Sequence, residues 1–336
     1  MASQEMYRLG SQRSVIRELF AYGQAQVKLS VKKMFFDFSI GNPTVPAPVC
    51  IQNAIEDIIH TRESAAVHGY TAAAGDQQVR QGLADYMNET YHARVEAGNF
   101  YMTCGAAASL TITLKALVES PDDEIIVIAP FFPEYSVFIE NAGAKKVVVP
   151  PDTEHFQIPL ATLEQAITPR TRAIIINSPN NPSGVVYSAE TYEKVGALLM
   201  KKSSEMGHAI YLISDEPYRE IIYDGLPILY VPDFYENTII CYSYSKSLSL
   251  PGERIGYILV PPYVEKSAEV YTAVCGAGRS MGFVCAPHLF QDVILKCLGQ
   301  TSNMKVYDEN RKLLYNGLKE MGYRLCLSQW SFLFVR

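Results

Sequence analysis

The 336-residue sequence is poor in charge and has no long hydrophobic run. Charged residues make up only 19% of the chain and apolar residues 48%, a composition too apolar for a disordered protein. No apolar run approaches the roughly 18 residues that a membrane helix needs. The N-terminal residues also lack the apolar core of a signal peptide. These absences predict a folded cytoplasmic protein without a membrane partner.

A basic surface and paired cysteines are missing as well. Lys and Arg number 29 against 35 Asp and Glu, which gives a formal net charge of −6. This acidic balance argues against a nucleic-acid partner, because nucleic acids are bound mainly by neutralising phosphates. None of the seven cysteines belongs to a C-x-x-C pair, and the six histidines are scattered. We therefore expect free thiols in a reducing compartment and no metal site.

The pattern of apolar residues predicts an α/β protein with a mostly parallel sheet covered by helices. Short runs typical of buried strands occur at 124–129, 145–149, 172–176, 209–213, 238–242 and 255–260. We expect a large domain over 45–295. A smaller α+β domain would combine 1–44 with 296–336, and two strand-like runs at 323–327 and 331–335 would belong to it.

One segment places a lysine among serines directly after a predicted strand. The amine of Lys246 can form a Schiff base with a carbonyl cofactor. Ser243, Ser245 and Arg254 offer the hydroxyls and the guanidinium that bind a phosphate dianion. Taken alone, the segment is also compatible with a polar surface loop.

A second strand ends in the sequence Ser-Asp-Glu-Pro-Tyr at 214–218. It delivers Asp215 to the carboxyl end of the sheet, where open α/β folds bind ligands. A carboxylate there can keep a pyridine nitrogen protonated, and Tyr218 can hydrogen-bond a ring hydroxyl. The alternative is an Asp that caps a helix beside a packed Tyr.

Three more segments follow predicted strands. Asn181 lies in a turn and can donate to a phenolic oxygen, although the turn alone is a weak signal. Gly105, Ala106 and Ala107 open a helix whose free N–H groups can bind a phosphate. Phe132 can stack on a flat ring or belong to the core.

Taken together and in this order, the five segments resemble the class I and II aminotransferases of the pyridoxal-phosphate-dependent fold type I superfamily, such as aspartate and aromatic aminotransferases. The resemblance runs from about residue 36 to the end of the chain. It implies a three-layer large domain with a seven-stranded sheet, and pyridoxal 5′-phosphate as the cofactor. It also implies that an amino group moves between an L-amino acid and a 2-oxo acid by a ping-pong mechanism.

The resemblance also assigns roles to individual residues. Lys246 would hold the cofactor as an internal aldimine and then act as general base. Asp215 would contact the pyridine nitrogen. Tyr218 and Asn181 would contact the ring oxygen, and Phe132 the face of the ring. The phosphate would be bound by Ser243, Ser245, Arg254 and the N–H groups at Gly105, Ala106 and Ala107.

Members of the family form homodimers with a shared active site. Tyr70 is the candidate for the tyrosine that reaches the phosphate bound by the partner subunit. Gly41, in a segment that resembles the substrate loop, would lie near the substrate carboxylate, and Asn181 would be a second substrate contact.

The sequence is compatible with two kinds of substrate side chain, a carboxylate or an aromatic or apolar group. Arg279 lies where dicarboxylate-specific relatives place an arginine that reads the substrate side chain. Tyr22, Phe36 and Phe38 would instead suit aromatic or apolar side chains.

Alternatives stay open within and beyond this resemblance. A carbon–sulfur lyase, a decarboxylase or a racemase-like enzyme shares the same cofactor anchors. A non-catalytic regulatory domain that binds the cofactor usually follows a DNA-binding module, and no basic recognition helix is visible here. Family members continue beyond the position of Phe334 and carry there an arginine that clamps the substrate carboxylate. We expect this chain to be a fragment that lacks that arginine.

Overall fold

The computed structural model describes residues 2–11, 15–29, 41–323 and 325. The chain divides into two compact units, 1–44 and 45–336. The first contains α1 (Gln4–Ser11) and α2 (Val15–Leu29), and the second contains the sheet and the other helices. The predicted grouping of 1–44 with 296–336 stays a prediction.

Two sequence-based predictions concern positions that cannot be compared. Phe36 and Phe38 lie outside the described residues. The same holds for the predicted strand at 331–335 and for most of the one at 323–327.

Seven strands form one sheet in the order β1-β7-β6-β5-β4-β2-β3. The neighbours among β2 to β6 run parallel, whereas β7 is antiparallel to both β1 and β6. This confirms the predicted mostly parallel, seven-stranded sheet. The strands are β1 (Phe100–Thr103), β2 (Glu124–Ile128), β3 (Lys145–Val149), β4 (Thr171–Asn177), β5 (Tyr211–Asp215), β6 (Thr238–Ser243) and β7 (Gly256–Leu259).

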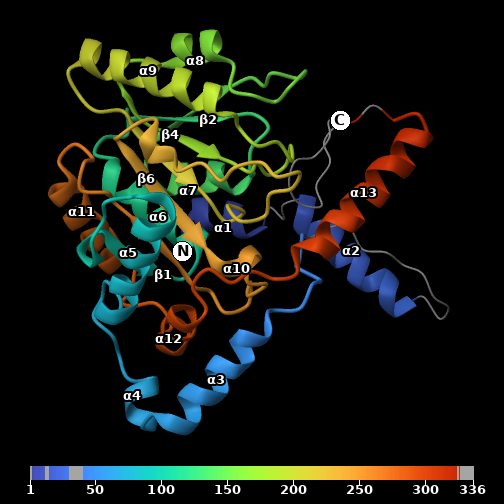
Figure 1. Cartoon of the computed structure of the whole chain (residues 1–336). Helices are drawn as coiled ribbons and strands as arrows, with labels where there is room; N and C mark the ends of the chain where they lie inside the picture. Colours follow the sequence, from blue (N-terminus) through green and yellow to red (C-terminus); the bar gives the residue numbers. More distant parts are fainter. Residues whose placement is uncertain (1, 12–14, 30–40, 324, 326–336) are drawn as a thin grey trace. The chain divides into compact units, whose positions relative to one another are not determined.

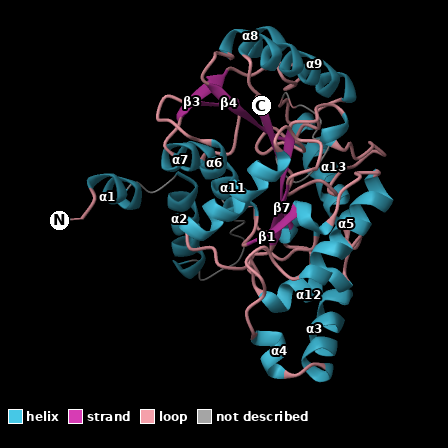
Figure 2. Cartoon of the chain, turned by 90° about the vertical axis from the view of Figure 1, so that its left-hand side faces the viewer, coloured by secondary structure: helices cyan, strands magenta, loops and turns pink. Residues whose placement is uncertain are grey.

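Helices cover both faces of this sheet and give the predicted three layers (Figures 1 and 2). One face is covered by α6 (Ala106–Leu117), α7 (Glu134–Ala142) and α11 (Ser267–Ser280). The other face is covered by α8 (Leu160–Ala166), α9 (Ala189–Met206), α3 (Val49–Thr61), α5 (Gln77–Tyr91) and α12 (His288–Lys296). Because both faces are covered, the inner strands are buried along almost their whole length.

The alternation of side chains along each strand decides which residues can meet. In β5, Ile213 packs on the side of α6 and α7, whereas Leu212 packs on the side of α8 and α9. In β6, Cys241 lies on the α6 side and Tyr242 on the α5 side. Residues at odd and even positions at the carboxyl ends of these strands therefore belong to two different environments.

Three helices outside the layers complete the described α-helices of this unit. α4 (Ser64–His68) follows α3, and α13 (Met304–Glu320) is the last helix described. α10 (Tyr244–Ser247) is a single turn that follows β6. This turn carries Lys246, so the lysine is held directly at the end of a central strand.

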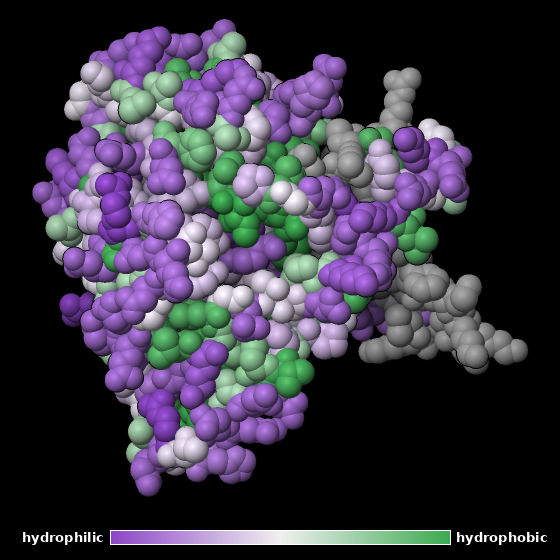
Figure 3. All heavy atoms as spheres, in the orientation of Figure 1, coloured by the Kyte–Doolittle hydropathy of each residue, from purple (hydrophilic) through white to green (hydrophobic). Residues whose placement is uncertain are grey.

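The face shown in Figure 3 is largely hydrophilic, with scattered apolar patches. A largely hydrophilic surface is typical of a chain that buries most of its apolar side chains in an internal core. Within the described ranges, no helix combines the length and the apolar character needed to cross a bilayer.

Candidate active site

A pocket open to solvent lies on the α6 and α7 side of the sheet, at the carboxyl ends of β4 and β5, and its empty space including that solvent is about 380 Å³. Six of the residues that line it were predicted from the sequence for a cofactor site: Ala106, Ala107, Phe132, Asn181, Asp215 and Tyr218. Its lining residues are Ala106, Ala107, Leu110, Phe132, Asn177, Asn181, Asp215, Pro217 and Tyr218. The predicted meeting of separate segments at one sheet edge is therefore observed for these six positions.

Asp215 is the most polar group in this pocket and is almost completely buried. Its Oδ2 accepts a hydrogen bond of 2.5 Å from the hydroxyl of Tyr135, a residue of α7. Its Oδ1 is buried and has no hydrogen-bond partner in the part of the chain that the structure describes. Burial raises the pKa of Asp215 to about 7, against the lowering effect of the Tyr135 hydrogen bond. A buried acceptor of this kind fits a cationic N–H donor from a ligand.

Asn181 and Tyr218 lie beside this carboxylate and are tied to each other. The Asn181 side-chain amide donates to the Tyr218 hydroxyl over 3.4 Å. The Asn181 backbone N–H donates to Asn177 Oδ1 over 2.6 Å, and Asn177 Nδ2 donates to the Asp215 carbonyl over 2.8 Å. The loop after β4 is thus fixed to the end of β5, where the two polar groups can contact one ligand atom.

Lys246 reaches the same edge of the sheet through strand register. Cys241 of β6 pairs with Asp215 of β5, so the chain beyond Cys241 extends past the carboxylate at the same edge. Burial, together with the charge of Arg254, lowers the pKa of Lys246 to about 8. An amine with this pKa is partly neutral near pH 8 and can act as a nucleophile or base.

Hydroxyl and guanidinium groups gather next to the lysine. Ser243 Oγ and Ser245 Oγ are 2.7 Å apart, and the Ser245 backbone N–H donates to Ser243 Oγ over 3.2 Å. Arg254 Nη1 donates to Ser245 Oγ over 3.4 Å. These three predicted phosphate-binding residues are therefore neighbours, although none lines the pocket described above.

Gly105 connects this cluster to the start of α6. Its φ of +85° and ψ of 176° belong to a region that side-chain-bearing residues avoid. A Cβ on Gly105 would lie 2.8 Å from Nη2 of Arg254. Gly256 packs equally closely, since a Cβ there would lie 3.0 Å from the Gly105 Cα and 2.2 Å from the Tyr242 carbonyl oxygen. The glycines let the backbone N–H groups of α6 and the Arg254 guanidinium approach the same point.

The sequence did not identify Tyr135, Asn177 and Gly256 as parts of the site. Asn177 is the register partner of Asp215 on the neighbouring strand, which a strand alignment would have revealed. Tyr135 is the second residue of α7, and Gly256 starts β7. Neither carries a sequence signal that distinguishes it from a core residue.

Lys246 and Gly105 also lie outside the lining of this pocket, and so do three further predicted residues. Tyr70 follows α4 with 90% of its surface exposed, and Arg279 near the end of α11 is also exposed. Gly41 is exposed within the unit 1–44. Their predicted contacts with the partner's phosphate and with substrate stay predictions.

The family profile described as "Aminotransferase class I and II" matches residues 33–336. The chain belongs to this family. A solved amino transferase from Eubacterium rectale is 54% identical, with a TM-score of 0.96 over 99% of this chain and 83% of that one. The aspartate aminotransferase of Thermotoga maritima is 30% identical over 315 residues, which cover 92% of this chain and 79% of that protein. The probable N-acetyl-LL-diaminopimelate aminotransferase of Bacillus subtilis is 30% identical over 246 residues, 72% of this chain and 60% of that protein.

Membership in the family confirms the expected enzyme class and cofactor. The protein is an aminotransferase (EC 2.6.1.-) that depends on pyridoxal 5′-phosphate. It transfers an amino group between an amino acid and a 2-oxo acid, by the ping-pong mechanism that is general for the family. The readings as a lyase, a decarboxylase or a cofactor-binding regulator are not supported.

Proposed function

We propose that this aminotransferase binds its cofactor between the N-terminus of α6, the end of β5 and the turn α10, with Lys246 as the covalent anchor. The observation that carries the proposal is the buried Oδ1 of Asp215, which lacks a hydrogen-bond partner among the described residues. The protonated ring nitrogen of pyridoxal 5′-phosphate is a cationic N–H donor of the kind this atom needs.

The other anchors fit the remaining parts of the cofactor. Ser243, Ser245 and Arg254, with the free N–H groups at the start of α6, match a phosphate dianion in charge and hydrogen bonding. Asn181 and Tyr218 can both donate to the ring oxygen from the position where they meet. Phe132 provides an aromatic face in the same pocket.

When bound, pyridoxal 5′-phosphate supplies an aldehyde that condenses with amines and a ring that accepts electrons. The residues of this chain then determine where protons move. Because the pKa of Lys246 is lowered to about 8, a large share of its amine is neutral near that pH and can accept the proton of the substrate Cα. Asp215 holds a proton on the ring nitrogen through charge attraction in a buried site.

Two properties of the whole enzyme are part of the proposal. We infer a homodimer in which Tyr70 contacts the partner's phosphate, and its 90% exposure within one chain supports this role. We also infer a cytoplasmic location, supported by the six free cysteines among the described residues. Gly41 and Arg279 remain the candidates for the carboxylate and the side chain of the substrate.

A spectroscopic experiment tests the cofactor site and narrows the substrate. Purified protein loaded with pyridoxal 5′-phosphate should show the visible absorbance of a lysine adduct, and Lys246→Ala should lose it. Lys194→Ala is the matched control, because Lys194 is an exposed lysine paired with Glu190 on α9. Titration with a panel of amino acids and then oxo acids should bleach and restore the band for the true substrates. If Lys246→Ala keeps the band and Lys194→Ala behaves identically, the assignment of Lys246 is wrong.

A further inference from the structure

Three residues that we propose to contact the cofactor are each followed in the sequence by a residue of a second cluster of buried polar side chains. Glu216 follows Asp215, and Arg219 follows Tyr218. Ser247 follows Lys246 in α10. Glu216, Arg219 and Ser247 belong to one network of contacts. This network includes Tyr242 and lies on the α5 side of the sheet. The cofactor pocket and this network thus share the same short backbone segments.

Arg219 is the centre of the network and is only 5% exposed. Its Nε lies 3.4 Å from Glu216 Oε2 and 3.5 Å from Glu220 Oε1. Its Nη2 donates to the hydroxyl of Tyr257 on β7 over 2.6 Å, and its Nη1 contacts Met87 Sδ on α5 at 3.5 Å. One side chain therefore connects the loop after β5 to β7, which lies two strands away in the sheet, and to a helix.

Tyr242 extends the network to the turn that carries the lysine. The guanidinium of Arg219 lies 4.3 Å from the centre of the Tyr242 ring, which is a cation–π contact. The Tyr242 hydroxyl donates to Glu220 Oε2 over 2.8 Å and lies 2.9 Å from Ser247 Oγ. A continuous path of polar contacts thus runs from Arg219 to the residue next to Lys246.

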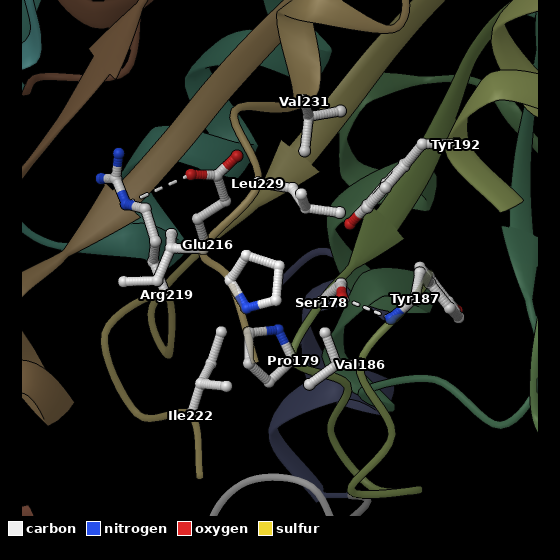
Figure 4. A pocket seen from close by; sticks show the side chains of 12 residues that line it. Ser178, Pro179, Val186, Tyr187, Tyr192, Glu216, Arg219, Ile222, Leu229 and Val231 are labelled. Atoms are coloured by element: carbon white, nitrogen blue, oxygen red, sulfur yellow. Dashed lines mark hydrogen bonds and ion pairs between the residues drawn. The ribbon is translucent and has the colours of Figure 1, made fainter. Parts of the chain in front are cut away.

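The ion pair lies in largely apolar surroundings, and the buried Arg219 Nε faces Glu216 as a charge contact without a hydrogen bond among the described residues. Figure 4 shows Glu216 and Arg219 at the wall of a cavity whose other side chains include Leu229, Val231 and Ile222. Apolar neighbours lower the local dielectric, so the attraction between the charges is greater than at the surface. Removing one partner from such a pair is costly, because it leaves a buried charge without compensation.

The loop that this network holds has little regular structure of its own. Residues 217–220 form a turn rather than a helix or strand. The Ile221 N–H donates to the Tyr218 carbonyl over 2.8 Å. The Tyr218 side chain is therefore carried by a turn, and the side chain of the buried Arg219 is the next one in the chain.

Resting on the proposed cofactor site, we propose that Arg219 is a positioning residue that fixes Asp215, Tyr218 and Lys246 relative to one another from the opposite side of the sheet. It does not contact the cofactor. Its contacts with Glu216 and Glu220, and through Tyr242 with Ser247, hold the backbone segments that carry the three cofactor-facing groups.

The experiment compares three variants of the full chain. Arg219→Met removes the charge and keeps much of the side-chain volume, and Arg219→Lys keeps the charge without the fork. Arg311→Met is the matched control. The Arg311 side chain is only 1% exposed and forms ion pairs with Asp224 and Asp308. Its guanidinium also lies over the Tyr223 ring. None of these four residues lines the cofactor pocket. For each variant we would measure thermal unfolding, the dissociation constant of pyridoxal 5′-phosphate and the rate at which its lysine adduct forms.

The positioning role predicts a specific combination of results. Arg219→Met should weaken cofactor binding by about tenfold or more and slow adduct formation by up to about 100-fold, since small misplacements have effects of this size. Arg219→Lys should recover part of both losses. Arg311→Met should lower the unfolding temperature and leave both cofactor parameters within about twofold of wild type. If Arg219→Met only lowers the unfolding temperature, as Arg311→Met does, Arg219 is merely structural.

A milder variant keeps the test decisive if Arg219→Met does not fold. Tyr242→Phe retains the ring above Arg219 and removes only the hydroxyl contacts to Glu220 and Ser247. It should slow adduct formation at Lys246 at least about threefold without loss of folding, and an unchanged rate would overturn the proposed link. If wild type itself forms no adduct at Lys246, the proposed cofactor site fails. If wild type forms it and all Arg219 and Tyr242 variants match it, only the positioning role fails.

Discussion

Replacing Asp215 by Asn should change how the stability of the cofactor-free protein depends on pH. Burial raises the pKa of Asp215 from 3.8 to about 7 in the folded protein. A difference of about 3 units corresponds to about 4 kcal/mol, at about 1.4 kcal/mol per unit. Between these two pKa values the folded state holds this proton while the unfolded chain releases it. The contribution of Asp215 to the free energy of unfolding should therefore be fully present below about pH 4, fall between about pH 4 and 7, and be lost above about pH 7.

The assay is urea unfolding of wild type and Asp215→Asn, both free of cofactor, at about pH 5 and about pH 8. Over this interval wild type should lose about 2–3 kcal/mol of stability relative to the variant, because the amide does not titrate. Adding pyridoxal 5′-phosphate should abolish or reverse this difference in sign, since a cationic ring nitrogen favours the ionised carboxylate. A pH-independent difference between the two proteins would refute the reasoning that Asp215 is a desolvated carboxylate that needs a cationic partner.

Two other predictions concern the phosphate side of the site. Gly105→Ala should destabilise the protein by about 1–3 kcal/mol in urea unfolding, because of its backbone angles and the 2.8 Å approach to Arg254. Gly252→Ala, with open space around the new Cβ, should stay within about 0.5 kcal/mol, and equal effects would contradict the packing argument. Arg254→Met should raise the pKa of Lys246 above about 8, because the Arg254 charge helps to lower it. Adduct formation would be measured as a function of pH with pyridoxal, which has no phosphate. The midpoint of this pH dependence should move upward in the variant. An unchanged midpoint would show that the Arg254 charge does not affect the pKa of Lys246.

The sheet and the main anchors could be predicted because their signals are local. Buried strands such as 172–176 and 209–213 show continuous apolar runs, and functional groups at the ends of parallel strands meet at one edge. Asp215 is the last residue of β5, and Lys246 lies three residues after the end of β6, so the local sequence was enough to place both at this edge.

The rest of the site depends on contacts between elements that are distant in the sequence. Tyr135 meets Asp215 across 80 residues, and the partner of a carboxylate on another element has no local signature. Gly256 is required because two strands and a turn approach closely, which only the assembled sheet reveals. Arg219 is adjacent to Tyr218, yet its role depends on Tyr242 and Tyr257 from other strands. Sequence patterns identify the groups that face the cofactor more readily than the groups that hold them.

The central claim is that Lys246 anchors the cofactor, and covalent trapping tests it most directly. Protein loaded with pyridoxal 5′-phosphate is reduced with borohydride, which fixes the adduct, and is then digested and analysed by mass spectrometry. We predict one dominant pyridoxyl group, located on Lys246, and its loss when the protein is first mixed with an amino acid substrate. A dominant label on another lysine, or equal labelling of the Lys246→Ala variant, would contradict the account.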